Sequence, residues 1–357
     1  MKVGFLSISN RTVDQREAKM ALFDSGHALG PMISVSEKDE IEWALAQLRP
    51  VCDVIVIEGE TDEFYKLYSD RLSAHTESFD IDGKLFCVTP AATSAFLLDK
   101  FVPLLNSTHK NKKQFQVVVF KTFNKSEAEL KTLLKDFTKQ RSKVQIGFFP
   151  AFMECEVHVR VSTSMPKADF NEIMNKIMPI LYKYTYALER VTIAERVAQM
   201  LIDLGLKLKI AESFTGGALA QAFTSLPGAS KYLVEDIVSY SISSKINRLG
   251  LSAQSIAEKG VVSKDTAYQM AVGLINSGNC DIAISTTGNA GPSAVSGAVG
   301  ECILAIGDRQ EVHVMRYMFD GDREDNIKRG VKTALFILYN YLEMLEASRQ
   351  KKGGQPE

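Results

Sequence analysis

Short apolar segments alternate with helical patterns in the first part of the chain, and this alternation constrains the fold more than any other feature. The segment Val54–Ile57 is continuously apolar, which is typical of a parallel strand buried on both faces. Ser36 is placed to cap a helix that follows it. The elements predicted here are strands at 2–8, 54–57 and 85–88 and helices at about 16–26 and 36–48. This order predicts a doubly wound parallel sheet, and therefore an α/β fold.

The chain is long enough for several domains. It has 357 residues, and single hydrophobic cores rarely grow beyond roughly 250–300 residues. The polar segment 106–113 separates the first α/β pattern from a smaller one, in which Ser126 and Glu129 have the spacing of a capping box. A third pattern begins near residue 190. The predicted divisions are 1–108, 114–185, 190–346 and a disordered tail at 347–357.

The second and third patterns also mix strands with helices. In the second, strands are predicted at 116–120, 144–149 and 156–161, before an amphipathic helix at 173–181. In the third, a helix at 193–201 precedes strands at 206–211, 236–240, 281–286, 298–306 and 311–319. A long last helix is predicted from Asp322 to about Leu345. The whole chain is therefore predicted to be a multi-domain α/β protein.

Composition argues against several classes of function. The net charge is −1, without the basic excess of nucleic-acid binders, so no direct nucleic-acid partner is predicted. No apolar run approaches the roughly 20 residues of a membrane span, and the N-terminus does not resemble a signal peptide. The five cysteines have neither metal-ligand nor redox spacing. These features predict a cytoplasmic protein with reduced thiols and no membrane contact.

The segment Ala211–Gly217 is the first candidate for chemistry. Ser213 follows a predicted strand, and the carboxyl edge of an α/β sheet is where ligands normally bind. Gly216 and Gly217 let the backbone approach a ligand, and the helix that they begin presents N–H groups to an anion. A tight strand-to-helix turn, with a serine or threonine as the N-cap, explains the same residues.

Tyr240 and Lys245 form a second candidate. Tyr240 closes an apolar strand, and Lys245 lies slightly more than one helical turn beyond it. A lysine held near a hydroxyl group can take up its proton if burial lowers the pKa of the lysine. A surface lysine beside a half-buried tyrosine is the simpler explanation of this segment taken alone.

The segment Thr287–Pro292 and Arg323 are the remaining candidates. The segment follows an apolar strand and lacks side-chain bulk, which suggests a backbone pressed against a ligand, although a glycine-proline loop explains it equally well. Asp322 can cap the last helix, so Arg323 lies in its first turn, where the helix dipole disfavours a cation. Arg323 is therefore either a ligand for phosphate or carboxamide oxygen, or an exposed arginine beside an acid.

The shared layout of these candidates is more informative than any one of them. Three strand ends and one helix start meet where an α/β sheet gathers its site. They supply a hydroxyl, an amine and a guanidinium, which are the groups that an amide hydrolase needs. None of the five histidines lies in these segments. Neither a Ser-His triad nor a histidine-bound metal is therefore predicted.

Six motifs in order carry a family resemblance. They are Ala-Glu-Ser-x-Thr-Gly-Gly at 211–217, Tyr-Ser-x-x-x-Lys at 240–245, Gly-Val-Val-Ser at 260–263, Thr-Gly-x-Ala-Gly-Pro at 287–292, Val-Gly at 299–300 and Gly-Asp-Arg at 321–323. Over roughly residues 190–345 the chain resembles the C-terminal domain of the CinA (competence/damage-inducible) family, whose members include nicotinamide-mononucleotide amidohydrolases.

The resemblance implies roles for named residues. The implied catalytic residues are Ser213, Tyr240, Lys245 and Thr287. The implied substrate-binding residues are Glu212, Thr215, Gly216, Gly217, Gly288, Ala290, Gly291 and Arg323. It further implies a small nucleotide substrate, no metal or cofactor in this domain, and a homodimer. Ile242 stands where the family often has asparagine, and Asn289 where it has an aliphatic residue. These departures are expected to affect contacts with the substrate rather than the chemistry.

Residues 1–185 resemble the longer CinA architecture, in which a molybdopterin-binding-like domain precedes a small, KH-like α/β domain. Three glycine or proline motifs of the first domain are replaced here, by residues 9–13, 58–62 and 90–93. The second replacement brings Glu58, Glu60 and Asp62. Because glycine loops at helix starts make phosphate sites, the metal-dependent nucleotide pyrophosphatase activity of the family is expected to be absent.

Two classes of function follow. In the first, the C-terminal domain is an amidase of pyridine nucleotide salvage, with Ser213 as nucleophile, Lys245 as its base and Tyr240 assisting proton transfer. A variant of it has Lys245 or Tyr240 activating water while Ser213 only binds the substrate. In the second, the protein is a non-catalytic adaptor in DNA uptake or the response to DNA damage. Release of ammonia from the nucleotide separates the two.

Overall fold

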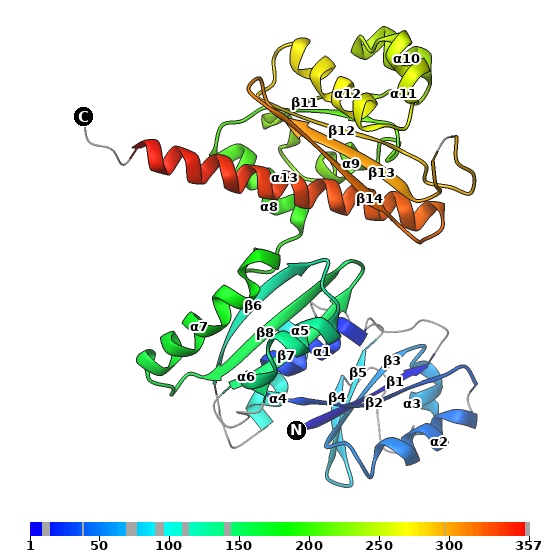
Figure 1. Cartoon of the computed structure of the whole chain (residues 1–357). Coiled ribbons are helices and arrows are strands. Elements are labelled where there is room, and N and C mark those ends of the chain that lie inside the picture. The colour runs from blue at the N-terminus through cyan, green and yellow to red at the C-terminus, as the bar shows by residue number, and fades with distance from the viewer. Residues whose placement is uncertain are drawn as a thin grey trace. The chain divides into compact units, whose positions relative to one another are not determined.

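The chain divides into two compact units, Met1–Leu188 (unit 1) and Glu189–Glu357 (unit 2), in a computed structural model (Figure 1). The described residues are 1–8, 15–37, 39–68, 77–89, 96–108, 114–138, 144–295 and 297–353. The division after Leu188 lies close to residue 190, where the third α/β pattern is predicted to begin. Of the predicted boundary segment 106–113, residues 106–108 end a helix (Val102–Thr108), while 109–113 lie outside the described residues, so this boundary stays a prediction.

The first sheet of unit 1 has the strand order β2-β1-β3-β5-β4. Its strands are β1 (Lys2–Ile8), β2 (Ala28–Val35), β3 (Val54–Gly59), β4 (Ser78–Ile81) and β5 (Lys84–Thr89). The first four in the sheet are parallel, and β4 joins β5 antiparallel. The helical segments around it are α1 (Gln15–Asp24), α2 (Asp39–Leu48), α3 (Asp62–Leu67), η1 (Phe96–Phe101) and α4 (Val102–Thr108).

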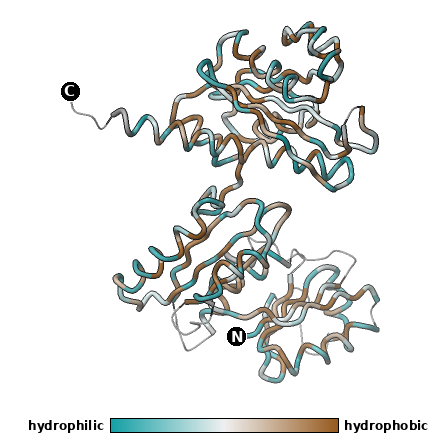
Figure 2. The backbone as a smooth tube through the Cα atoms, in the orientation of Figure 1, coloured by the Kyte–Doolittle hydropathy of each residue, from teal (hydrophilic) through white to brown (hydrophobic). Residues whose placement is uncertain are grey.

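This sheet is covered on both faces, as predicted for a doubly wound fold. Residues of α2 and α3, such as Leu48 and Phe64, pack on Leu6 and Ile57 in one apolar cluster. Residues of α1 and α4 pack on alternate positions of the same strands in a second cluster. Because both faces are buried, hydrophobic residues, coloured brown in Figure 2, predominate in the central strands of this sheet.

The second sheet of unit 1 is antiparallel, with the order β7-β8-β6-β9. Its strands are β6 (Phe115–Phe123), β7 (Val144–Ala151), β8 (Glu154–Ser162) and β9 (Thr185–Ala187). Its helices are α5 (Glu127–Leu133), α6 (Lys135–Thr138), α7 (Lys167–Leu181) and η2 (Tyr182–Tyr184). The predicted capping box is confirmed, because Ser126 and Glu129 bond each other's backbone N–H groups at the start of α5.

Unit 2 has one mixed sheet with the order β11-β10-β12-β13-β14. Its strands are β10 (Leu208–Glu212), β11 (Leu233–Val238), β12 (Ile282–Gly288), β13 (Glu301–Gly307) and β14 (Val312–Met318). The first three in the sheet are parallel, so their carboxyl ends meet at one edge. The helices are α8 (Ile193–Asp203), α9 (Ala218–Thr224), η3 (Ala229–Lys231), α10 (Ile242–Leu249), α11 (Ala253–Lys259), α12 (Lys264–Asn276) and α13 (Arg323–Gly353). The α/β fold class is thereby confirmed in both units.

Three local predictions are corrected. Ser36 does not cap α2, which begins at Asp39; its backbone N–H donates to the Glu40 carboxylate at 3.2 Å instead. Strand β2 is missing from the predicted elements; it contains Pro31, which is tolerated because β2 lies at the edge of the sheet. Helix α13 continues past Leu345 to Gly353, and Arg349 donates to the carbonyl of Leu204 at 2.9 Å. Residues 347–353 of the predicted disordered tail are therefore helical.

Candidate active site

Ser213 and Lys245 meet at the carboxyl edge of the unit 2 sheet. Ser213 is the first residue after β10, and Lys245 lies in the first turn of α10, which Ser241 caps through the backbone N–H of Ser244. The Nζ atom of Lys245 lies 2.8 Å from the Oγ atom of Ser213 and donates to the carbonyl of Ser239 at 2.5 Å. The two segments are 32 residues apart, so the sheet edge brings together the hydroxyl and the amine.

The environment of Lys245 makes it a potential base. Its side chain is 0% exposed, and no carboxylate within ion-pair distance is found for it in the described part of the chain. Burial disfavours the charged ammonium and lowers the pKa of Lys245 to about 8. A neutral amine has two hydrogens and one lone pair. It can therefore donate to the Ser239 carbonyl and still accept the proton of Ser213.

Glu212 does not face a ligand, contrary to the implied substrate-binding role. Its side chain is fully buried, and its carboxylate accepts hydrogen bonds from the backbone N–H groups of Gly217, Leu219 and Ala220, at 2.8, 3.2 and 2.7 Å. The carboxylate thus occupies the start of α9. This corrects the expectation that the start of α9 binds a phosphate. Its backbone N–H groups already donate to the Glu212 carboxylate, which occupies the place of an external anion.

The loop between Ser213 and α9 depends on its glycines. Gly216 and Gly217 have φ angles of +61° and +101°, which favour glycine. The N–H of Ser213 donates to the carbonyl of Thr286 at 2.9 Å, so the loop is attached to β12. Among the hydrogen bonds that the described residues form, none is donated by the N–H groups of Thr215 and Gly216. These two N–H groups therefore have no hydrogen-bond acceptor in the described part of the protein.

Thr287 is placed beside the site, but its proton is directed elsewhere. Its hydroxyl donates to the carbonyl of Val261 at 3.1 Å, and its side chain is 1% exposed. It therefore anchors the Gly-Val-Val-Ser segment at 260–263 rather than aiming a donor at the substrate. The neighbouring Thr286 hydroxyl forms a 2.8 Å hydrogen bond with that of Thr215. This contact between Thr215 and Thr286 thus joins the loop after β10 to strand β12.

The loop after β12 is tightly packed. Gly288 approaches the β13 backbone so closely that a Cβ atom would lie 2.1 Å from the carbonyl oxygen of Glu301. Asn289 is buried, and its carboxamide bonds the backbone of Val295 at 3.1 Å and of Ala298 at 3.3 Å. This asparagine therefore braces the following loop, whereas the sequence suggested a change in substrate contact. Ala290 and Gly291 direct their carbonyl groups at α13.

Arg323 and Tyr240 form the outer part of the site. The guanidinium of Arg323 donates to the carbonyl of Gly291 at 2.6 Å and to the hydroxyl of Tyr240 at 3.1 Å. Tyr240 is 64% exposed, and Arg323 is exposed as well. Asp322 caps α13 as predicted, since it accepts from the N–H of Asp325 at 2.9 Å. Arginine has five N–H donors, so an exposed guanidinium with two partners retains capacity for an anion.

Two residues of the site were missed in the sequence. The backbone carbonyl of Ser239 accepts a hydrogen bond from the Lys245 amine. Any residue type can supply a backbone carbonyl, so the sequence gives no signal for this role. Asn326 is 0% exposed and bonds both the Ala290 carbonyl and the Gly321 turn. Its position three residues after Arg323, on the same side of a helix, is the one signal that points to it.

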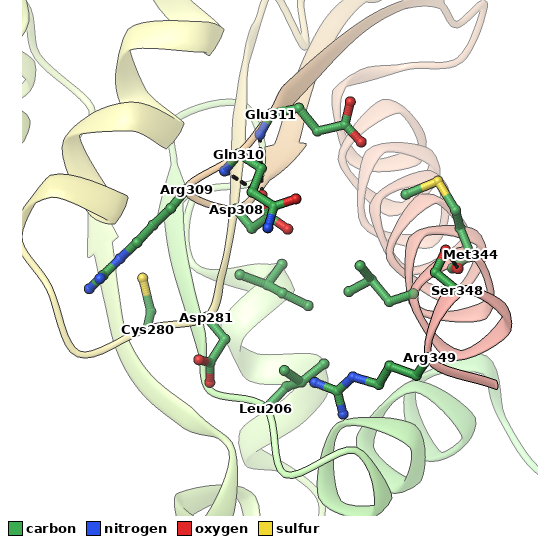
Figure 3. A pocket seen from close by; sticks show the side chains of 12 residues that line it. Leu206, Cys280, Asp281, Asp308, Arg309, Gln310, Glu311, Met344, Ser348 and Arg349 are labelled. Carbon is green, nitrogen blue, oxygen red and sulfur yellow. Dashed lines mark hydrogen bonds between the residues drawn. The ribbon is translucent and has the colours of Figure 1, made fainter. Parts of the chain in front are cut away.

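A cavity of about 670 Å³ lies elsewhere in unit 2, at the amino ends of β10 and β12 (Figure 3). It is bounded by the β13–β14 turn and the last turns of α13, with Asp308 and Arg349 among its lining. It contains none of the predicted site residues. Across the described chain, no group of three or more acidic, histidine or cysteine side chains could hold a metal, and no helix could cross a membrane.

The fold and site of unit 2 define a class: an α/β domain with a serine paired to a buried lysine at the carboxyl edge of its sheet. A family model described as the CinA C-terminal domain matches residues 190–342. The chain belongs to the CinA family.

Similar proteins cover the chain to different extents. A CinA-like protein of Geotalea uraniireducens (strain Rf4) is 33% identical over 66% of this chain and 57% of its own length, so this chain matches less than two thirds of that relative. A CinA-like protein of Geobacter sulfurreducens is 28% identical over 91% of this chain and 95% of its own. A solved Competence-Damaged Protein (CinA) superfamily protein of Klebsiella pneumoniae is 30% identical over 43% of this chain and 96% of its own, with a TM-score of 0.42.

Proposed function

We propose that unit 2 is an amidase that converts nicotinamide mononucleotide to nicotinate mononucleotide and ammonia. The observation that carries this proposal is the 2.8 Å contact between the Ser213 hydroxyl and the buried amine of Lys245. Burying a lysine without a carboxylate partner destabilises the folded protein. A buried lysine whose pKa is lowered is typical of catalytic bases. The second candidate, a non-catalytic adaptor, gives no reason for this arrangement.

The reaction follows from the geometry. Neutral Lys245 takes the proton of Ser213 while the Oγ atom bonds to the carboxamide carbon, giving a tetrahedral oxyanion. The N–H groups of Thr215 and Gly216 are the proposed oxyanion donors. The carbon–nitrogen bond then breaks, and Lys245 returns the proton to the departing ammonia. Water attacks the resulting ester, with Lys245 as base again, and releases the carboxylate and Ser213.

Arg323 is the proposed anchor for the substrate phosphate. It is exposed, charged, and held by the Gly291 carbonyl and the Tyr240 hydroxyl, neither of which neutralises it. Tyr240 accepts from Arg323, so its own O–H remains to assist proton transfer at the substrate. We further propose, from the family resemblance, that unit 2 forms a homodimer and works without a metal or cofactor.

The direct test is release of ammonia from nicotinamide mononucleotide by the full chain, with the nicotinate nucleotide identified as the second product. Turnover at a rate well above the uncatalysed reaction supports the proposal. No release of ammonia across pH 6–9, from a protein shown to be folded, would favour the adaptor. Treatment with a chelator is expected to leave the rate unchanged, because Ser213 and Lys245 need no metal for this chemistry.

A further inference from the structure

Asn326 connects two segments of the proposed site that are far apart in the sequence. It lies one helical turn after Arg323 in α13, and its side chain is 0% exposed. Its Nδ2 atom donates to the carbonyls of Ala290, at 3.0 Å, and Gly321, at 2.8 Å. Its Oδ1 atom accepts from the N–H of Gly321 at 3.0 Å. Both amide hydrogens and the oxygen are therefore used.

These contacts lie next to those of Arg323. Asn326 donates a hydrogen bond to the carbonyl of Ala290, and Arg323 donates to the next carbonyl in the chain, that of Gly291, at 2.6 Å. On the other side, Asn326 fixes Gly321, two residues before Arg323. Gly321 leaves the room for this, since a Cβ atom there would lie 3.2 Å from the Asn326 oxygen. The asparagine thus holds both the loop that orients the guanidinium and the turn that carries it.

Arg323 needs such support for physical reasons. It is the first residue of α13, where the helix dipole repels a cation. Its side chain is long and exposed, so ordering it costs conformational entropy. Its partners among the described residues are a neutral carbonyl and a neutral phenol, and no carboxylate pairs with it there. The position of the Gly291 carbonyl therefore decides where the guanidinium lies.

We propose that Asn326 is a positioning residue: it locks the Ala290–Gly291 loop to the Gly321 turn, so that Arg323 presents its N–H groups to the phosphate of the substrate. This inference rests on the proposed function and deepens it. Asn326 touches no reacting atom. Its removal is expected to weaken use of a phosphate-bearing substrate without impairing the attack of Ser213.

The test compares Asn326→Asp and Asn326→Ala with wild type and with Asn340→Ala, an exposed asparagine of the same helix. The aspartate keeps the shape and the acceptor for Gly321 but loses both donations. With nicotinamide mononucleotide, KM is expected to rise about 10- to 100-fold in both variants, the cost of a misplaced group, with kcat nearly unchanged. Nicotinamide riboside, which lacks the phosphate, should be processed equally by all four proteins.

A double-mutant cycle sharpens the result. In an Arg323→Ala background, Asn326→Asp is expected to have no further effect on KM, because its effect passes through the arginine. Additive losses would overturn the proposal. So would an equal loss of kcat with both substrates, which would indicate general damage to the site.

Amide hydrogen exchange provides a readout that is independent of activity. Asn326→Asp should accelerate exchange in residues 289–295 of the full chain, whereas Asn340→Ala should not. Unchanged exchange would overturn the positioning role. If wild type releases no ammonia from the nucleotide, the proposed function fails, and the exchange experiment still decides whether Asn326 holds this loop.

Discussion

Ser7 in unit 1 and Ser213 in unit 2 lie at comparable places in two similar sheets, but beside different partners. Ser7 lies near the end of β1 and Ser213 directly follows β10, and each of these two strands has a parallel neighbour on both sides. Ser7 donates to the buried carboxylate of Glu58 at 2.5 Å, whereas Ser213 lies 2.8 Å from the buried amine of Lys245. Carboxylates are ordinarily far weaker bases than an amine whose pKa is near 8.

In both units the topology of the sheet determines where the serine lies, and the side chain beside it determines its chemistry. A serine that is hydrogen-bonded to a carboxylate keeps its proton, because the carboxylate is a weak base. A serine that is hydrogen-bonded to a neutral amine can transfer its proton to the amine. At the unit 1 edge, Glu58 is turned inward, and Glu60 and Asp62 are exposed. Acidic groups repel phosphate. This supports the expectation that unit 1 lacks the pyrophosphatase activity. Residues 9–13 and 90–93 lie outside the described residues.

The largest expected effect is that of Ser213→Ala. Loss of the nucleophile should lower kcat for the nucleotide by about 10⁴-fold or more, with little change in stability, since the side chain is only half-buried. Steady-state ammonia release and thermal unfolding measure the two quantities. Ser7→Ala is the matched control and should retain full activity. Near-normal turnover by the Ser213 variant would remove this serine from the mechanism.

Lys245→Arg should be almost as severe. An arginine keeps the positive charge but does not deprotonate near neutral pH, so it cannot accept the Ser213 proton. We expect kcat to fall by about 10³-fold or more, the contribution typical of a general base combined with nucleophile activation. Calorimetric titration with the mononucleotide should show that binding is largely retained. A variant that loses binding and rate together would make Lys245 an electrostatic anchor instead.

The pH profile of the wild-type enzyme tests the same base without substitution. Burial lowers the pKa of Lys245 to about 8, and only the neutral amine is active. The rate should therefore rise about tenfold per pH unit below pH 8 and level off above it. Measurements of kcat/KM from pH 6 to 10 would show this. A rate that falls through the same range would contradict the assignment.

Thr287→Val should have a smaller effect. The variant keeps the shape of the side chain and loses the hydrogen bond to the Val261 carbonyl, which was 3.1 Å long. If the threonine only anchors that segment, kcat should fall about tenfold or less and the melting temperature should drop slightly. A loss comparable to that of Ser213→Ala would instead show that the hydroxyl turns to the oxyanion during the reaction.

The smallest expected signal is that of unit 1. The full chain carrying Ser213→Ala should not hydrolyse ADP-ribose at a measurable rate, with or without added divalent metal. Product formation is followed by chromatography of the nucleotides. Metal-stimulated turnover would show that unit 1 retains a pyrophosphatase activity, and the two sheets would then both carry active sites.

Local patterns in the sequence were sufficient to predict much of the fold and part of the site. Apolar runs such as Val54–Ile57 predict buried strands, and the capping box at Ser126 predicts the start of α5, because these signals depend on residues close together in the chain. The motif around Ser213 and the lysine at 245 could likewise be read as candidates. Their contact depends on the parallel order of β10 and β11, which the α/β pattern implies only in outline.

Other features were decided by the tertiary structure. Glu212, read as a ligand for substrate, is turned to the start of α9, and the proton of Thr287 is directed at Val261. The buried environment of Lys245 and the contacts of Asn326 likewise involve segments distant in the sequence. The direction of a hydrogen bond and the burial of a charge depend on which backbone groups a fold brings within about 3 Å, and no local residue pattern records that distance.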